Sequence, residues 1–93
     1  MRALTWNDFA DSAGSLYMVA VGEAQIELKL DLAVEIESAG REGGSFRLEF
    51  LGPSDPLLPQ ASYPVRVGDE TIDVFMVPVG VDRTGARYEA IFY

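Results

Sequence analysis

The stretch that decides the fold is Ala24-Gln25-Ile26-Glu27-Leu28-Lys29-Leu30-Asp31-Leu32-Ala33-Val34-Glu35-Ile36-Glu37. Every second residue from Ile26 to Ile36 is apolar, and the positions between them are polar except Ala33. This period of two is typical of a strand with one buried face and one solvent face. At about 3.3 Å per residue the run would reach roughly 45 Å if straight, so a small domain must bend it. We therefore expect the long, curved strand of a small barrel or a strongly twisted sandwich, with all six apolar side chains inward.

The composition is that of one folded domain spanning residues 1–93, with 48% hydrophobic residues available for a core. The absence of histidine and cysteine removes imidazole bases, thiolate nucleophiles, disulfides and the usual zinc ligands. A net charge of −8 disfavours nucleic acid and anionic membranes as partners. Neither a signal peptide nor a membrane-spanning run is evident, so a cytoplasmic location is expected.

A short helix is predicted over residues 4–14, before the first strand. Thr5 is a good N-cap, Asp8 is its capping-box partner, and Gly14 provides the stop. Two helical turns are not stable alone in water. We therefore expect Trp6 and Phe9 to dock on the sheet and close one end of the barrel.

The remaining apolar segments read as short strands, and no internal repeat is evident. They cover residues 15–21, 45–50, 65–67, 71–81 and 87–93. Pro78 cannot donate to a ladder and predicts an edge or a bulge. Together with the long strand these segments predict an all-β fold, a small antiparallel six-stranded barrel or twisted sandwich with a short N-terminal capping helix.

The connection over residues 57–64 is too apolar for a free loop. Leu58, Pro59, Gln60 and Tyr63 are predicted to form a rigid structural turn. In this interpretation the Gln60 amide is buried and bonds backbone groups that the turn leaves unpaired.

Few residues offer catalytic or binding chemistry, and each has a simpler explanation. The glycine-rich loop over 40–44 lacks the Lys-Ser/Thr ending of a phosphate-binding loop and suits a hairpin connection. Glu35 and Glu37 share one strand face at roughly 6.5–7 Å, near the separation of an inverting glycosidase, but on the solvent side. Lys29, the only lysine, faces outward and is a poor base for a serine.

The acidic and aromatic residues do not have the spacing or setting of a metal site or a stacking site. Asp69, Glu70 and Asp82 lack the ligand spacing of a calcium loop and suit turns. The aromatic residues suit a core better than a base-stacking platform, with Tyr93 the least settled. The set comprises Trp6, Tyr17, Phe75, Tyr88, Phe92 and Tyr93. We expect no catalytic residue, no cofactor and no metal.

Several blocks resemble an uncharacterised family of small bacterial proteins of about this length. They are Phe9 with Gly14; Phe50-Leu51-Gly52-Pro53; Leu57-Leu58-Pro59-Gln60-Ala61-Ser62-Tyr63; Phe75-Met76-Val77-Pro78-Val79-Gly80 with Asp82; and Gly85-Ala86-Arg87-Tyr88-Glu89-Ala90-Ile91-Phe92. Members of that family are often encoded beside phage-tail-collar-like (microcystin-dependent-protein-like) genes. The resemblance brings no known activity, and it implies an association with a tail-like or surface-fibre assembly.

Two hypotheses about function follow. The first is a non-catalytic interaction or assembly protein that binds a protein partner or itself, most simply as a homodimer. The second is a small-ligand-binding barrel or a carboxylate-based enzyme. Some strands are apolar on both faces, which predicts an uncovered patch for a protein contact. Its candidate residues are Phe75, Val77, Val79, Ile91 and Tyr93, with the last strand offering a free edge.

Overall fold

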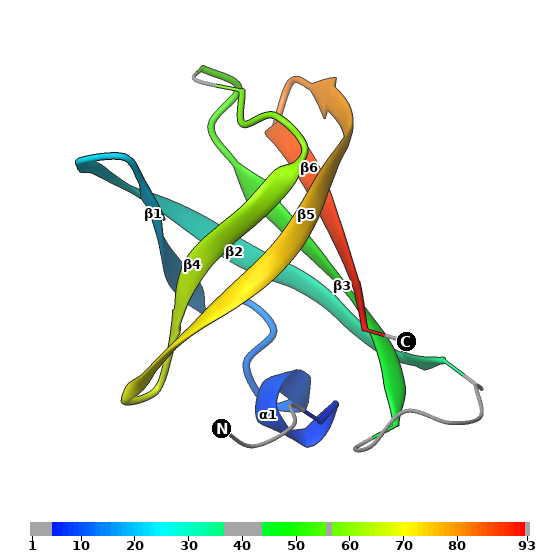
Figure 1. Cartoon of the computed structure of the whole chain (residues 1–93). Coiled ribbons are helices and arrows are strands. Elements are labelled where there is room, and N and C mark those ends of the chain that lie inside the picture. Colours follow the sequence, from blue (N-terminus) through cyan, green and yellow to red (C-terminus); the bar gives the residue numbers. More distant parts are fainter. Residues whose placement is uncertain (1–4, 37–43, 56, 93) are drawn as a thin grey trace.

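Antiparallel strands close into a six-stranded barrel with one short helix at its N-terminal end (Figure 1). The computed structural model describes residues 5–36, 44–55 and 57–92. The elements in chain order are α1 Asn7–Ala10, β1 Leu16–Val21, β2 Ala24–Ile36, β3 Ser45–Gly52, β4 Ala61–Val67, β5 Glu70–Asp82 and β6 Gly85–Phe92. Around the barrel the strands follow the order β1-β2-β3-β6-β5-β4. The predicted all-β barrel is therefore confirmed.

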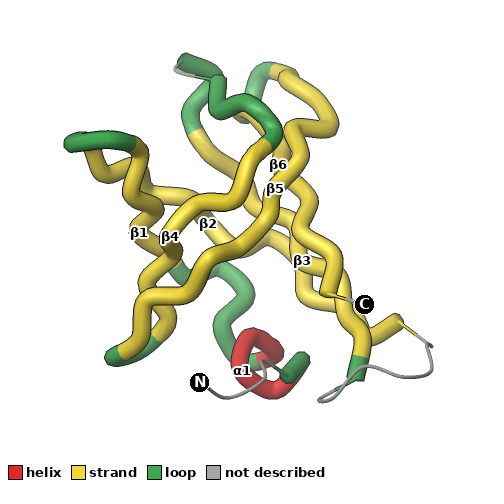
Figure 2. Tube along the Cα trace, in the orientation of Figure 1, coloured by secondary structure: helices red, strands yellow, loops and turns green. Residues whose placement is uncertain are grey.

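Two strands are longer than the sequence pattern suggested. β4 begins at Ala61 rather than at Val65, and its ladder with β5 runs through Pro64, which pairs with Asp73. β3 continues to Gly52, which pairs with Ala86 of β6. Prolines and glycines near these ends read as breaks in the sequence, but pairing with a neighbouring strand keeps the segments extended (Figure 2).

A bulge in β2 reverses the two faces of the long strand. Leu28 and Leu30 are fully buried as predicted, but the register with β3 shifts between Leu30 and Leu32. Because one extra residue faces the partner strand there, the side chains that follow exchange faces. Leu32 and Val34 are each 37% exposed, and Ala33 packs against the core instead. The prediction that all six apolar side chains of this strand point inward is therefore wrong after Asp31.

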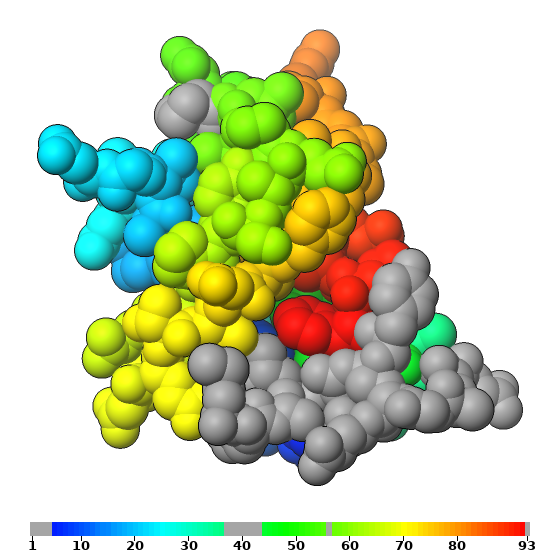
Figure 3. Space-filling model, viewed as in Figure 1, coloured from blue at the N-terminus to red at the C-terminus, as the bar shows by residue number. Residues whose placement is uncertain are grey.

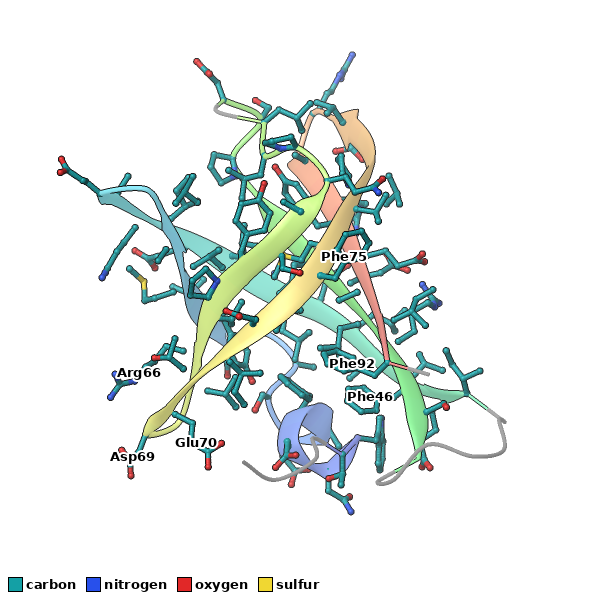
Figure 4. All side chains as sticks on the ribbon, viewed as in Figure 1. Phe46, Arg66, Asp69, Glu70, Phe75 and Phe92 are labelled. Carbon is teal, nitrogen blue, oxygen red and sulfur yellow. The ribbon has the colours of Figure 1, made fainter. Side chains whose placement is uncertain are left out.

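The helix is shorter than predicted but closes the barrel as expected. α1 has four residues, its N-cap position is Trp6, and the Thr5 amide donates to Asp8 Oδ2 at 2.7 Å. Phe9 is 1% exposed, and the centre of its ring lies 5.7 Å from that of Phe46. Phe46 in turn stacks on Phe92 beside the helix (Figure 4). The Trp6 indole Nε1 donates to the carbonyl oxygen of Ala33 at 3.2 Å. The short helix is therefore stabilised by its contacts with the sheet, and the predicted second helical turn is absent from the described residues 5–14.

The barrel consists of two halves with the same arrangement, so the expectation of no internal repeat is wrong. β1 and β2 turn at Gly22 with φ 61°, and β4 and β5 turn 46 positions later at Gly68 with φ 60°. Every cross-strand pair from Leu16–Lys29 to Val21–Ala24 recurs 46 positions later, from Ser62–Phe75 to Val67–Glu70. Identical residues at these equivalent positions are Tyr17 and Tyr63, Val19 and Val65, Val21 and Val67, Gly22 and Gly68, and Ile26 and Ile72.

The third strands, β3 and β6, correspond at a spacing of 40, from Ser45 to Gly85, and have the same burial pattern. The halves meet in antiparallel pairs of equivalent residues, Val19 with Val65 and Glu49 with Glu89. Such pairing is that of two units related by an approximate two-fold axis. β1 and β4 are joined at the Val19–Val65 pair alone among the described residues.

The turn before β4 is anchored by the buried side chain of Leu58 and by hydrogen bonds to two tyrosines. Leu58 is 2% exposed, and its amide donates to the Tyr88 hydroxyl at 2.8 Å. The Tyr63 hydroxyl donates to the carbonyl oxygen of Pro59. Burial raises the pKa of the Tyr63 hydroxyl, with a smaller contribution from Tyr88. Gln60 is exposed, so the prediction of a buried Gln60 amide is wrong, and the two phenols satisfy backbone groups in its place.

Candidate functional site

The interior of the barrel is filled by side chains. Both halves contribute residues that are at most 1% exposed, namely Val19, Leu28, Leu30, Leu48, Phe50, Val65, Val74, Met76, Tyr88 and Ala90. Tyr88, the polar member, uses its hydroxyl to accept the Leu58 amide. A functional site is therefore to be sought on the outer surface and at the rims.

The residues considered for catalysis and metal binding are dispersed. Glu35 is exposed, and its suggested partner Glu37 lies outside the described residues, as do residues 40–43 of the glycine-rich loop. Glu70 begins β5 and Asp82 ends it, so the suggested calcium ligands lie at opposite ends of a 13-residue strand. Across residues 5–36, 44–55 and 57–92, no group of three such side chains could hold a metal ion. In the same part of the chain, no helix has the length and apolarity needed to span a bilayer.

A polar hollow of about 450 Å³ lies between the helix and the β4–β5 turn. Its lining includes the carboxylates of Asp8, Asp69 and Glu70 and the hydroxyls of Ser12 and Tyr17. Asp8 already accepts the Thr5 amide. The carboxylates have local structural explanations, because Asp8 belongs to the helix start and Asp69 and Glu70 to the β4–β5 turn, while Tyr17 is a core residue of β1.

A network of arginines and carboxylates lies on the outer face where β3 and β6 meet. Arg47 bonds Glu49 on its own strand and lies 3.4 Å from Glu89 on β6. Arg87 lies 2.8 Å from Asp31 and 4.0 Å from Glu49. The Arg47–Glu89 and Arg87–Glu49 pairs are equivalent under the approximate two-fold axis, which passes through this network. We call these five residues the axial ion network.

The carboxylates of the axial ion network raise the pKa of both arginines. The hydrogen bond to Glu49 raises the pKa of Arg47, and the hydrogen bond to Asp31 raises the pKa of Arg87. All five side chains are between 23% and 38% exposed, so solvent still screens their interactions. The network therefore supplies an ordered pattern of two positive and three negative side chains at the surface, and it contributes modestly to stability.

The two halves differ where β5 meets β6. In the first half the β2–β3 ladder continues past the bulge to Leu30–Phe50 and Lys29–Leu51. In the second half the β5–β6 ladder ends at Val77–Glu89, so Phe75 and Ile91 are not paired in it. Beyond this point β5 and β6 diverge toward the helix (Figures 1 and 2).

An apolar hollow of about 120 Å³ opens at this divergence. It is lined by Phe75, Val77, Glu89 and Ile91, which we call the docking patch. Phe75 is 50% exposed, whereas Val77 and Ile91 are half-buried. In the space-filling view the yellow-orange surface of β5 borders the red surface of the end of β6 (Figure 3).

The structure brings together three of the five residues suggested as an interface, Phe75, Val77 and Ile91. Val79 is 54% exposed, but it is the bulged residue of β5 and does not line the hollow. Tyr93 lies outside the described residues. The last strand does not offer a free edge along its length, because β6 pairs with β3 from Gly52–Ala86 to Phe46–Phe92 and with β5 up to Glu89.

Sequence reasoning missed Glu89 and the two arginines beside the patch. A signal for them exists in the repeated pattern Arg-x-Glu, which is Arg47-Leu48-Glu49 on β3 and Arg87-Tyr88-Glu89 on β6. In a strand this spacing places both charged side chains on one face.

Residues 4–92 match the family model described as Domain of unknown function (DUF6916), and the chain belongs to that family. No curated protein and no solved structure matches the chain.

Proposed function

Because the family description assigns no activity, we propose from the site alone that the protein is a non-catalytic interaction or assembly module. It binds a protein partner through the docking patch on the outside of the barrel. The observation that carries this proposal is Phe75, an aromatic side chain left 50% exposed beside an apolar hollow. Aromatic residues at the centre of a patch supply most of the binding energy in protein interfaces.

The arrangement of the remaining groups supports an interaction role. The barrel interior is filled with apolar side chains, which leaves little room for a small ligand. Arg47 and Arg87 are engaged by carboxylates next to the patch and form a polar border for it. An apolar centre with a polar rim is the usual anatomy of a protein interface.

The partner class follows from charge and resemblance. A net charge of −8 disfavours phosphate-bearing partners and leaves a protein surface as the simplest one. The resemblance described above adds a component of a tail-like or surface-fibre assembly as the candidate partner, acting with this protein in the cytoplasm.

A capture experiment with matched variants tests the proposal. Tagged wild-type protein, Phe75→Lys and Leu16→Lys are used as baits in a lysate of the native host, and mass spectrometry identifies what is retained. Leu16 is the matched control, because it is 61% exposed and lies on β1, away from the docking patch. We expect a partner retained by wild type and Leu16→Lys but lost by Phe75→Lys. A retained set that is identical for all three baits would overturn the proposal.

A further inference from the structure

We propose that the docking patch binds the same patch of a second copy of this chain, with the Phe75 ring of each protomer in the hollow of the other. This inference rests on the proposed function and names its partner. It is carried by the comparison of the two halves of the barrel, by the shape of the patch and by the charges around it.

The first half serves as an internal control for the second. Lys29 is the equivalent of Phe75, on the same outer face and 46 positions earlier. Around Lys29 the ladder with β3 is closed and the exposed side chain is charged. Around Phe75 the ladder is open and the exposed side chain is aromatic. The second half thus departs from the pattern of the first half in backbone and side chain together, and the departure exposes an apolar surface.

The docking patch is complementary to itself. A two-fold dimer uses the same surface on both subunits, so a protruding group and a recess that accepts it must lie side by side. Phe75 protrudes at one side of a hollow of about 120 Å³. Cavities of about 150 Å³ hold a benzene-sized group, so the hollow has the scale of an aromatic ring. Val77 and Ile91 provide apolar walls for that ring.

The charges beside the patch also suit a second copy. Two chains of charge −8 repel each other over most of their surface. Arg47 lies opposite Ile91 in the β3–β6 ladder, and Arg87 lies on the same face of β6 as Glu89. Arginines and glutamates alternate here, so a second copy turned by half a rotation can place arginine opposite glutamate. The two arginines and three carboxylates of the axial ion network sum to −1, so this face carries only a small part of the net charge of −8.

Sedimentation equilibrium over a range from low micromolar to near-millimolar protein measures the association. We expect wild-type protein to form a dimer within this range. Phe75→Lys installs the residue that the first half carries, and it should weaken the dimer by at least about thirtyfold, the effect of a hot-spot residue. Leu16→Lys adds the same charge elsewhere and should leave the dimer unchanged. Circular dichroism and thermal melting show whether each variant keeps the fold.

Cross-linking of single-cysteine variants locates the interface independently of these substitutions. The chain has no cysteine, so Val77→Cys and Leu16→Cys each carry one thiol. A short bis-maleimide should join two copies of Val77→Cys and leave Leu16→Cys monomeric. Efficient cross-linking of Leu16→Cys without that of Val77→Cys would place the contact on another face and overturn the inference.

The outcomes separate this inference from the proposed function. If wild-type protein stays monomeric throughout the concentration range, the proposal that the patch binds a second copy is overturned. A dimer that Phe75→Lys does not weaken overturns it as well. If the protein is monomeric but still captures a different partner through Phe75, the proposed interaction function stands, and that partner is what binds the docking patch. If neither a second copy nor another protein depends on Phe75, both proposals fail.

Discussion

Alanine substitution of Leu30 and of Leu32 tests the bulge at Asp31, which determines which side chains of β2 face outward. Uninterrupted alternation would bury both leucines, and substituting either would then be costly. In the structure Leu30 is fully buried, whereas Leu32 is 37% exposed and lies beside Glu49 on the outer face. Leu30→Ala leaves a cavity in the core and should lower the free energy of unfolding by about 2–5 kcal/mol. Leu32→Ala leaves no cavity and should lower it by about 1 kcal/mol or less.

Urea unfolding followed by circular dichroism measures both free energies, and thermal melting provides a second readout. For a domain of this size about 1 kcal/mol shifts Tm by ~4–8 °C, so Leu30→Ala should lower Tm by at least ~8 °C. Lys29→Ala, a substitution of an exposed side chain, is the control and should stay within about 0.5 kcal/mol. Equal losses for Leu30→Ala and Leu32→Ala would show that the strand keeps one face throughout and would refute the bulge.

Three further substitutions, one of them with a matched control, test the turns. Gly85→Ala should destabilise by about 1–3 kcal/mol in urea unfolding, because φ is 129° and a Cβ would overlap a carbonyl oxygen of β3, whereas Gly80→Ala meets no atom and should be nearly neutral. Tyr88→Phe leaves the buried Leu58 amide without its acceptor and should cost about 1–3 kcal/mol in the same assay. Hydrogen bonds from Thr84, two residues further along the turn, lower the pKa of Asp82, so the stabilisation that Asp82 contributes is present above its ordinary pKa of 3.8 and is lost as the pH falls through the folded value. Asp82→Asn should therefore be less stable than wild type at neutral pH and equal to it in acid, and a difference that persists in acid would contradict this account.

The period of two in residues 24–36 was enough to predict a long strand with one buried face, because alternation is a local property of the sequence. The exchange of faces after Asp31 was missed because Ala33, the one apolar residue in the polar series, is the only sign of it in the pattern. Which side chains of β2 are buried after Asp31 depends on the register with β3 and on the N-terminal segment. In that segment Trp6, the N-cap residue of the helix, donates a hydrogen bond to the Ala33 carbonyl oxygen. Both are contacts between segments distant in sequence.

The repeat was missed because its spacing changes along the chain. The connection between the second and third strands covers residues 37–44 in the first half and 83–84 in the second, so the spacing falls from 46 to 40. Apolar residues on both faces of β5 and at the end of β6 were enough to predict Phe75, Val77 and Ile91 as a candidate patch, and the role of this patch in binding stays a prediction. The hollow itself depends on where the β5–β6 ladder ends, which no local pattern indicates.

The Val19–Val65 pair that joins β1 to β4 has a consequence for how the barrel opens. The β3–β6 ladder extends from Phe46–Phe92 to Gly52–Ala86, so the two junctions between the halves are unequal. Local opening follows the fewest protecting contacts, and we expect the amide protons of β1 and β4 to exchange with solvent before those of β3 and β6. Opening there converts a closed barrel into a six-stranded sheet with two bare edges, which are templates for aggregation. If hydrogen exchange shows equal protection of all six strands, the junction between β1 and β4 does not open first.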